Sequence, residues 1–122
     1  MMNAKTQHFN QRETMKVREL EGDRLDFWVA RARGLATFNG ENGELLYHPG
    51  HNLPPRKWNP SHYWSQGGPL LEEHHIDLNW DTEGTREWSA SIEPDILAQG
   101  RTVLEAAMRA FVILKFGEEI QE

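Results

Sequence analysis

The stretch that decides the fold is Thr102–Phe111, TVLEAAMRAF. Thr102 and Glu105 have the spacing of a capping box, in which each side chain bonds a free backbone N–H at the start of a helix. Apolar residues then recur at helical spacing, and Lys115 and Gly117 are typical of a last turn and its stop. The stripe comprises Leu104, Ala107, Met108, Phe111 and Leu114. The sequence therefore predicts a C-terminal helix that packs its apolar face on a sheet.

The partner sheet is predicted just before this helix. Residues 76–80, IDLNW, and residues 88–92, WSASI, alternate apolar and polar side chains, which is typical of strands with one wet face. The segment 81–87, centred on Gly84, is a turn between them, so the two strands form an antiparallel hairpin. The side chains expected to face the core are Ile76, Leu78, Trp80, Trp88, Ala90 and Ile92.

A second strand and helix are predicted near the N-terminus. Met15–Leu20 alternates as a short strand, and Gly22 breaks it. Leu25, Trp28, Val29 and Ala32 then lie on one face of a helix over residues 25–34. Acidic residues near its start and Arg31 and Arg33 near its end complement the helix dipole, and Gly34 is a natural stop.

The middle of the chain, residues 35–66, is predicted to be irregular. Two Asn-Gly pairs mark turns, and Pro49, Pro54, Pro55 and Pro60 exclude any long regular element. Only residues 45–47 are expected to form a short strand there. The fold class is α+β: a small antiparallel sheet with two main helices packed on one face and a long irregular middle loop.

The chain of 122 residues fits one domain, 15–117, with a flexible N-terminal arm at 1–14 and a C-terminal tail at 118–122. It has no cysteine, so disulfides and thiolate chemistry are excluded, and it has no apolar run long enough to cross a membrane. These features fit a cytoplasmic protein. The net charge of −6 and the scattered basic residues disfavour direct nucleic-acid binding.

The candidate binding surface is the aromatic Gly-Gly-Pro stretch at residues 63–71, YWSQGGPLL. Adjacent glycines allow a positive φ or a close approach to another surface, and the proline fixes its own φ, so a rigid corner is expected. The aromatics beside it either anchor a partner or plug the core. The binding residues predicted here are Tyr63, Trp64, Gln66, Gly67, Gly68 and Pro69.

Metal and catalytic sites are not predicted. His48 and His51 have HxxH spacing, and His62 or His74 is a candidate third ligand, but the pair lies in a proline-rich loop without a helix to fix its geometry. Glu72 and Glu73 precede His74 and His75, yet neighbouring strand residues point to opposite faces, so no acid/base pair is indicated. We therefore expect no metal, no cofactor and no catalytic residue.

Three segments resemble the NinX-like proteins, a small phage and prophage family of unknown function. They are residues 15–34, residues 60–72 with their Trp-x-Gln-Gly-Gly-Pro motif, and residues 106–111, AAMRAF. The resemblance covers roughly residues 15–117 and departs in the N-terminal arm and in the loop at 49–59. It implies a phage or prophage origin and action in the bacterial cytoplasm, and it carries no catalytic residues.

The function favoured by these observations is that of a non-enzymatic phage accessory protein that binds a host or phage macromolecule, with protein as the favoured class. The alternative is a small enzyme or ligand-binding protein with a pocket between the loop at 48–69 and the hairpin at 76–92. His62, Tyr63, Glu72 and His74 converging in one cleft would favour that alternative. The sequence leaves open whether the chain forms a homodimer.

Overall fold

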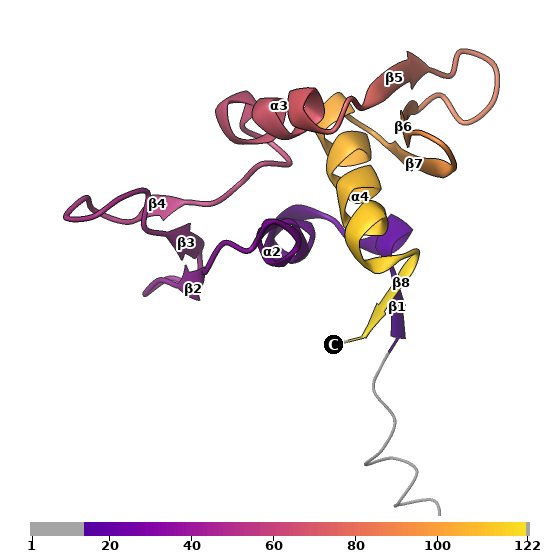
Figure 1. The fold of residues 1–122 in the computed structure, drawn as a ribbon. Coiled ribbons are helices and arrows are strands. Elements are labelled where there is room, and N and C mark those ends of the chain that lie inside the picture. Colours follow the sequence, from indigo (N-terminus) through magenta and orange to yellow (C-terminus); the bar gives the residue numbers. More distant parts are fainter. Residues whose placement is uncertain (1–13, 122) are drawn as a thin grey trace, which may run out of the picture.

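The computed structural model describes residues 14–121, which form an α+β domain (Figure 1). The predicted fold class is confirmed, with three small antiparallel sheets in place of one. The elements in order are β1 (Thr14–Lys16), a 3-10 helix η1 (Val17–Glu19), α2 (Gly22–Arg33), β2 (Phe38–Asn39), β3 (Leu45–Tyr47), β4 (Arg56–Lys57), α3 (Trp64–Glu73), β5 (Asp77–Trp80), β6 (Trp88–Ile92), β7 (Ile96–Gly100), α4 (Val103–Phe116) and β8 (Glu119–Gln121).

Helix α4 is the centre of the domain. Half of its predicted capping box is confirmed, because the Glu105 N–H donates to Thr102 Oγ1 at 3.1 Å. The return bond differs: Glu105 Oε1 accepts from the Arg101 N–H at 2.8 Å, one residue before the N-cap N–H that a capping box uses. Gly117 follows the helix as predicted. Most residues of α4 are buried on every side, which is the pattern of a helix enclosed by other elements. Leu114 is the exception on the predicted stripe, being exposed.

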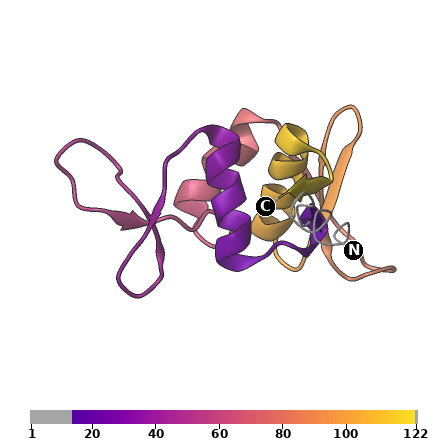
Figure 2. The same cartoon turned by 90° about the horizontal axis from the view of Figure 1, so that it is seen from below.

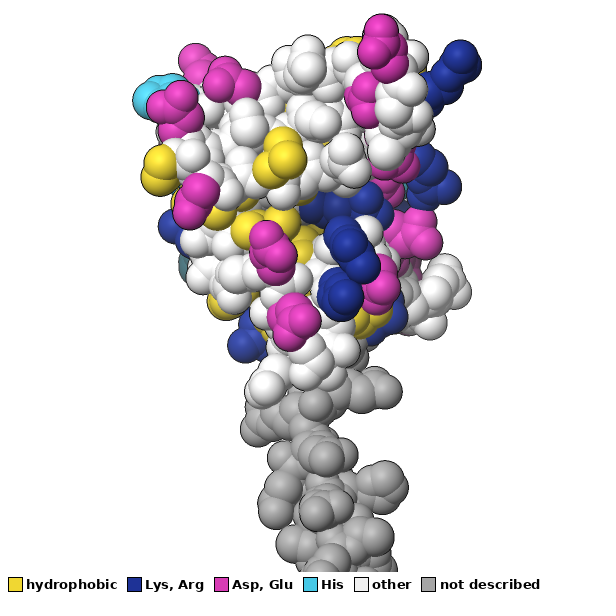
Figure 3. Space-filling model, turned by 90° about the vertical axis from the view of Figure 1, so that its right-hand side faces the viewer, with side chains coloured by type: hydrophobic (Ala, Val, Ile, Leu, Met, Phe, Trp, Pro, Cys, Tyr) yellow, Lys and Arg dark blue, Asp and Glu magenta, His cyan; other side chains and the backbone are white. Residues whose placement is uncertain are grey.

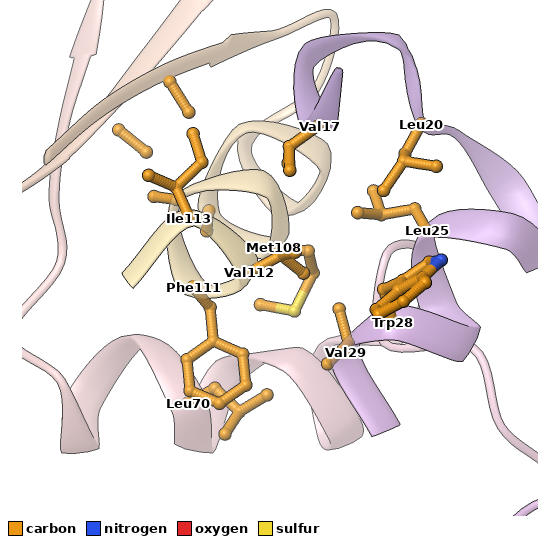
Figure 4. Close-up of a cluster of buried hydrophobic side chains, with 14 of the residues drawn as sticks. Val17, Leu20, Leu25, Trp28, Val29, Leu70, Met108, Phe111, Val112 and Ile113 are labelled. Carbon is orange, nitrogen blue, oxygen red and sulfur yellow. The ribbon is translucent and has the colours of Figure 1, made fainter. Parts of the chain in front are cut away.

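The other elements surround α4 in layers. The sheet β5–β6–β7 packs on one side of α4, and α2 and α3 pack on the other (Figures 1 and 2). Phe111 of α4 contacts Leu70 of α3, while Met108 faces Val29 of α2 (Figure 4). The helix α2 therefore packs against α4 rather than directly on the sheet, and Gly34 ends it as predicted, in a left-handed conformation.

The predicted strand at 15–20 is wrong beyond Lys16. The chain turns there into η1, because Val17 and Leu20, three residues apart, are both fully buried. That spacing suits a helical turn and not the two-residue period of a strand. The expected tail at 118–122 contains β8, whose Ile120 is buried and pairs with Met15 of β1. Apart from Thr14, the predicted N-terminal arm lies outside the described residues.

The middle segment projects from the helices as a small sheet, β2–β3–β4 (Figures 1 and 2). The strand expected at 45–47 is confirmed as β3, and its two-residue partners on either side were not predicted. Trp58 joins this segment to the core, because its N–H donates to the Leu45 carbonyl at 2.9 Å and its indole is buried against Tyr47.

The predicted hairpin is confirmed, with Trp80 opposite Trp88 and Leu78 opposite Ala90. A third strand, β7, was not predicted and pairs with β6. The expectation that Trp80 faces the core is wrong: it is 43% exposed, and Leu78 and Trp88 are only half-buried. The reason is that α4 covers β6 and β7, whereas β5 is the edge strand beyond its reach. Within residues 14–121, none of the helices has the length and apolarity to span a bilayer.

Candidate functional site

The predicted Gly-Gly-Pro corner is wrong, because residues 64–73 form the helix α3 with Pro69 inside it. Neither glycine adopts a positive φ. Gly67 instead allows a close approach: a β-carbon there would collide with the Pro60 carbonyl and with the Leu104 side chain. Packing of α3 against the preceding turn and α4 thus outweighs the poor helix propensity of glycine and proline.

The turn before α3 is fixed by Gln66. Its Oε1 accepts from the Asn59 N–H at 2.6 Å, and its Nε2 donates to the Lys57 carbonyl at 2.9 Å. The N–H groups of His62 and Tyr63 both donate to the Asn59 carbonyl, at 3.0 and 2.8 Å. Gln66 is therefore engaged within the protein, and it holds the segment that leads into α3.

The buried carboxylate of Asp26 also holds this turn, through hydrogen bonds from Ser61. Asp26 of α2 is fully buried, and it accepts from the Ser61 N–H at 2.9 Å and from the Ser61 hydroxyl at 3.0 Å. Burial raises the pKa of Asp26 to about 6, and the two bonds from Ser61 oppose that rise. The indole of Trp58 donates to the Asp26 carbonyl at 2.8 Å. These bonds tie α2 to the start of α3.

Asp26, Ser61 and His62 are the residue types of a hydrolytic triad, but their order differs. The Ser61 hydroxyl lies between the carboxylate and the imidazole, 3.1 Å from Nδ1 of His62, whereas a triad places the histidine in the middle. His62 Nδ1 also lies 3.2 Å from Asn59 Oδ1. The Ser61 hydroxyl donates to the Asp26 carboxylate, so these three residues do not have the geometry of a triad.

The six predicted binding residues are divided between surface and interior. Trp64 is 58% exposed, Tyr63 is 46% exposed, and Pro69 is also exposed. Gln66 and Gly68 are half-buried, and Gly67 is buried. The aromatic pair at the start of α3 is therefore the part of this stretch that a partner can reach.

Two further tryptophans extend this exposed surface. Trp64 and Trp88 line one hollow of about 370 Å³, and the ring of Trp80 lies 5.4 Å from that of Trp88. The other residues lining the hollow are Ser61, His62, Arg101, Thr102, Val103 and Leu104. We call Trp64, Trp80 and Trp88 with this hollow the tryptophan surface. It combines α3, the β5–β6 hairpin and the start of α4, which lie together in Figure 1.

The charges near the hollow are largely paired. The Arg101 guanidinium lies 2.6 Å from Glu21 and 3.5 Å from Glu105, and Arg109 lies 3.6 Å from Glu105. In the turn between β5 and β6, Asp81 accepts N–H bonds from Gly84 at 2.8 Å and from Thr85 at 2.9 Å, which fix the turn. These bonds lower the pKa of Asp81.

The face on the β7 side of α4 has a different character. An apolar hollow lies there between basic and acidic side chains, as Figure 3 shows. A cavity of about 330 Å³ is lined by Leu97 of β7 and Ile113 of α4, together with Lys16, Arg18 and Glu118. Charges of both signs line this cavity, and no aromatic side chain from residues 14–121 does.

Two of the described histidines, His48 and His74, pack on separate phenylalanine rings. His48 stacks on Phe38 with ring centres 5.0 Å apart, and His74 packs on Phe111 at 4.8 Å. Among the described residues, no group of three or more His, Cys, Asp or Glu side chains is placed to hold a metal ion. Of the four residues expected to converge in the alternative ligand-binding reading, only His62 lines the hollow at Trp64.

Fold and site define a small α+β protein with an exposed aromatic surface at the start of α3. A family model described as Bacteriophage P22, NinX matches residues 16–115. The chain therefore belongs to the NinX family of phage proteins, as the resemblance of its Trp-x-Gln-Gly-Gly-Pro motif predicted. No curated protein shows significant similarity to it.

Proposed function

We propose that this phage-derived protein is a non-enzymatic accessory protein that binds a host or phage protein through the tryptophan surface. Cytoplasmic action in the bacterial host is part of this proposal. The observation that carries it is the exposure of Trp64, more than half of which is open to solvent. Large aromatics are costly to leave in water, and they dominate binding energy where proteins meet.

The start of α3 is a rigid platform for such contacts. Gln66 and Asp26 fix the turn before the helix from two sides, through the bonds to Lys57, Asn59 and Ser61. A side chain on a fixed backbone loses little conformational entropy when a partner binds it. Tyr63 and Trp64 are therefore suited to act as anchors, with Gly67 and Gly68 serving the helix that presents them.

The test is capture from phage-infected cells with the wild-type protein and with Trp64→Ala and Tyr63→Ala. We expect a partner that the wild type retains and both variants lose, with melting temperatures unchanged because both side chains are exposed. Leu53→Ala is the matched control, since Leu53 is 49% exposed on the loop between β3 and β4. Equal capture by all four proteins would show that binding lies elsewhere.

A ligand-binding protein is the second candidate, and the hollow between Trp64 and Trp88 favours it. Trp80 separates the two functions, because it lies beside Trp88 but outside the lining of the hollow. A protein that spans the surface should bind Trp80→Ala more weakly. A small ligand confined to the hollow should bind that variant as it binds the wild type.

A further inference from the structure

The three tryptophans of the binding surface offer free hydrogen-bond donors. Trp58 uses its Nε1–H on the Asp26 carbonyl. By contrast, no atom of residues 14–121 accepts a hydrogen bond from Nε1 of Trp64, Trp80 or Trp88. Trp64 and Trp80 are exposed side chains, and among the half-buried and buried residues of the same part of the chain no buried side-chain donor is left without a partner, so the N–H of the half-buried Trp88 reaches solvent. An indole N–H can only donate, so its binding partner must supply acceptors.

The three rings lie near one another. Trp80 and Trp88 are tilted by 59° at a centroid distance of 5.4 Å, and Trp88 meets Trp64 across the hollow. Val103 and Leu104 supply apolar lining between them. Aromatic rings beside these two apolar side chains offer packing surfaces for compact, rigid apolar groups.

A polyproline II segment supplies both the hydrogen-bond acceptors and the compact apolar groups that this surface is suited to bind. Its backbone makes no internal hydrogen bonds, so its carbonyls are free acceptors, and its proline rings are compact and already rigid. Aromatic grooves with side-chain donors are the general means of binding such segments. We propose that the tryptophan surface binds a proline-rich segment of the partner protein in the polyproline II conformation; this rests on the proposed function.

Single-stranded nucleic acid also stacks on exposed aromatics, but it requires a cationic groove along its phosphates. The arginine at the hollow, Arg101, is already paired with Glu21 and Glu105, and the chain carries a net charge of −6. Charge therefore favours the peptide, and a nucleic-acid strand becomes a control in the test.

The experiment is an NMR titration of the full chain with a panel of Pro-x-x-Pro decapeptides that have acidic, neutral or basic flanks. Each of the five tryptophans gives one indole N–H signal, assigned from single Trp→Phe variants. We expect at least one peptide to shift the signals of Trp64, Trp80 and Trp88 with a dissociation constant below about 1 mM. The signal of Trp58 should stay unchanged, since its N–H is bonded internally.

Two variants separate the ring from its donor. Trp64→Ala should lower the affinity for the best-binding peptide at least about tenfold. Trp64→Phe should lower it about threefold, because phenylalanine keeps an aromatic face but lacks the N–H. Leu53→Ala should bind as the wild type does. The wild-type titration needs no variant, so a failure of Trp64→Ala to fold does not affect it.

The proposal is overturned if no peptide shifts the three signals, if Trp58 shifts equally, or if an oligothymidine strand binds more tightly than any peptide. If the peptide titration fails in one of these ways but Trp64→Ala still loses the captured partner, the proposed function stands and only the polyproline II proposal is overturned. If the titration fails and Trp64→Ala also keeps the partner, the tryptophan surface is not a binding site.

Discussion

Ser61 holds the buried carboxylate of Asp26 with two hydrogen bonds, from its N–H at 2.9 Å and from its hydroxyl at 3.0 Å. The two residues are far apart in sequence, one on α2 and the other in the turn before α3. The carboxyl group has little contact with water, and its pKa is raised to about 6 by burial. Folding therefore favours the protonated form of Asp26.

Stability should depend on pH through Asp26. Its folded-state pKa of about 6 lies above the ordinary value of 3.8, so the folded protein binds the proton more tightly than the unfolded chain. The contribution of this group is fully present below about pH 4 and is lost as pH rises through 6. Asp26→Asn cannot titrate, and its free energy of unfolding should rise relative to wild type by up to about 3 kcal/mol over that range.

Urea unfolding of both proteins at several pH values between 4 and 7 measures this difference. Asp77→Asn is the control, because Asp77 is exposed and should show a nearly constant difference from wild type. A pH-independent difference for Asp26→Asn would mean that Asp26 is ionised in the folded protein throughout this range.

The adjacent glycines of α3 should respond in opposite directions to alanine. A β-carbon at Gly67 would meet the Pro60 carbonyl and Leu104, whereas at Gly68 it would make an ordinary contact of 3.7 Å with Trp64. Gly67→Ala should therefore lower the free energy of unfolding by about 1–3 kcal/mol. Gly68→Ala should raise it by about 0.5–1 kcal/mol through helix propensity. Thermal or urea unfolding decides, and equal effects of the two changes would refute the packing role of Gly67.

Two residues on the same face of α4 should differ in their contribution to the core. Phe111 is buried against Leu70 and His74, and Phe111→Ala should lower the free energy of unfolding by about 3–5 kcal/mol. Leu114 lies on the same stripe but is exposed, so Leu114→Ala should have a much smaller effect. A small loss for Phe111→Ala in a thermal melt would contradict the central place of α4.

The cap of α4 should be measurable by itself. Thr102→Ala removes the acceptor for the Glu105 N–H and should destabilise the protein by about 1 kcal/mol. Thr82→Ala, in the exposed β5–β6 turn, changes the same residue type without a cap and should be neutral. Chemical unfolding of the two variants compares them directly, and no difference between them would show that the cap contributes little.

Local patterns predicted the elements in which local and tertiary preferences agree. Thr102 and Glu105 cap α4 because the bonds involved span only a few residues, and the alternation at 76–80 and 88–92 matches the observed register of β5 and β6. Trp80 shows the limit of alternation, since the pattern gives a face of the strand but not whether a helix covers it.

The site depended on contacts between distant segments, which local patterns do not contain. Glycine and proline oppose helix formation, so the sequence predicts a corner at residues 67–69, whereas α3 is helical there and packs closely on Pro60 and Leu104 at Gly67. Burial of Asp26 likewise requires Ser61 from another part of the chain. The signal that was available was an aspartate beside the apolar stripe of Leu25, Trp28 and Val29.

The pairing of β1 with β8 places Thr14 opposite Gln121, so both ends of the described chain leave the domain at the same pole. The tryptophan surface lies at the other pole, around α3 and the β5–β6 hairpin (Figure 1). Affinity handles or immobilisation attached at Thr14 or Gln121 therefore leave that surface unobstructed. A short linker joining Gln121 to Thr14 should also permit circular permutation, with new termini in the loop at Leu53.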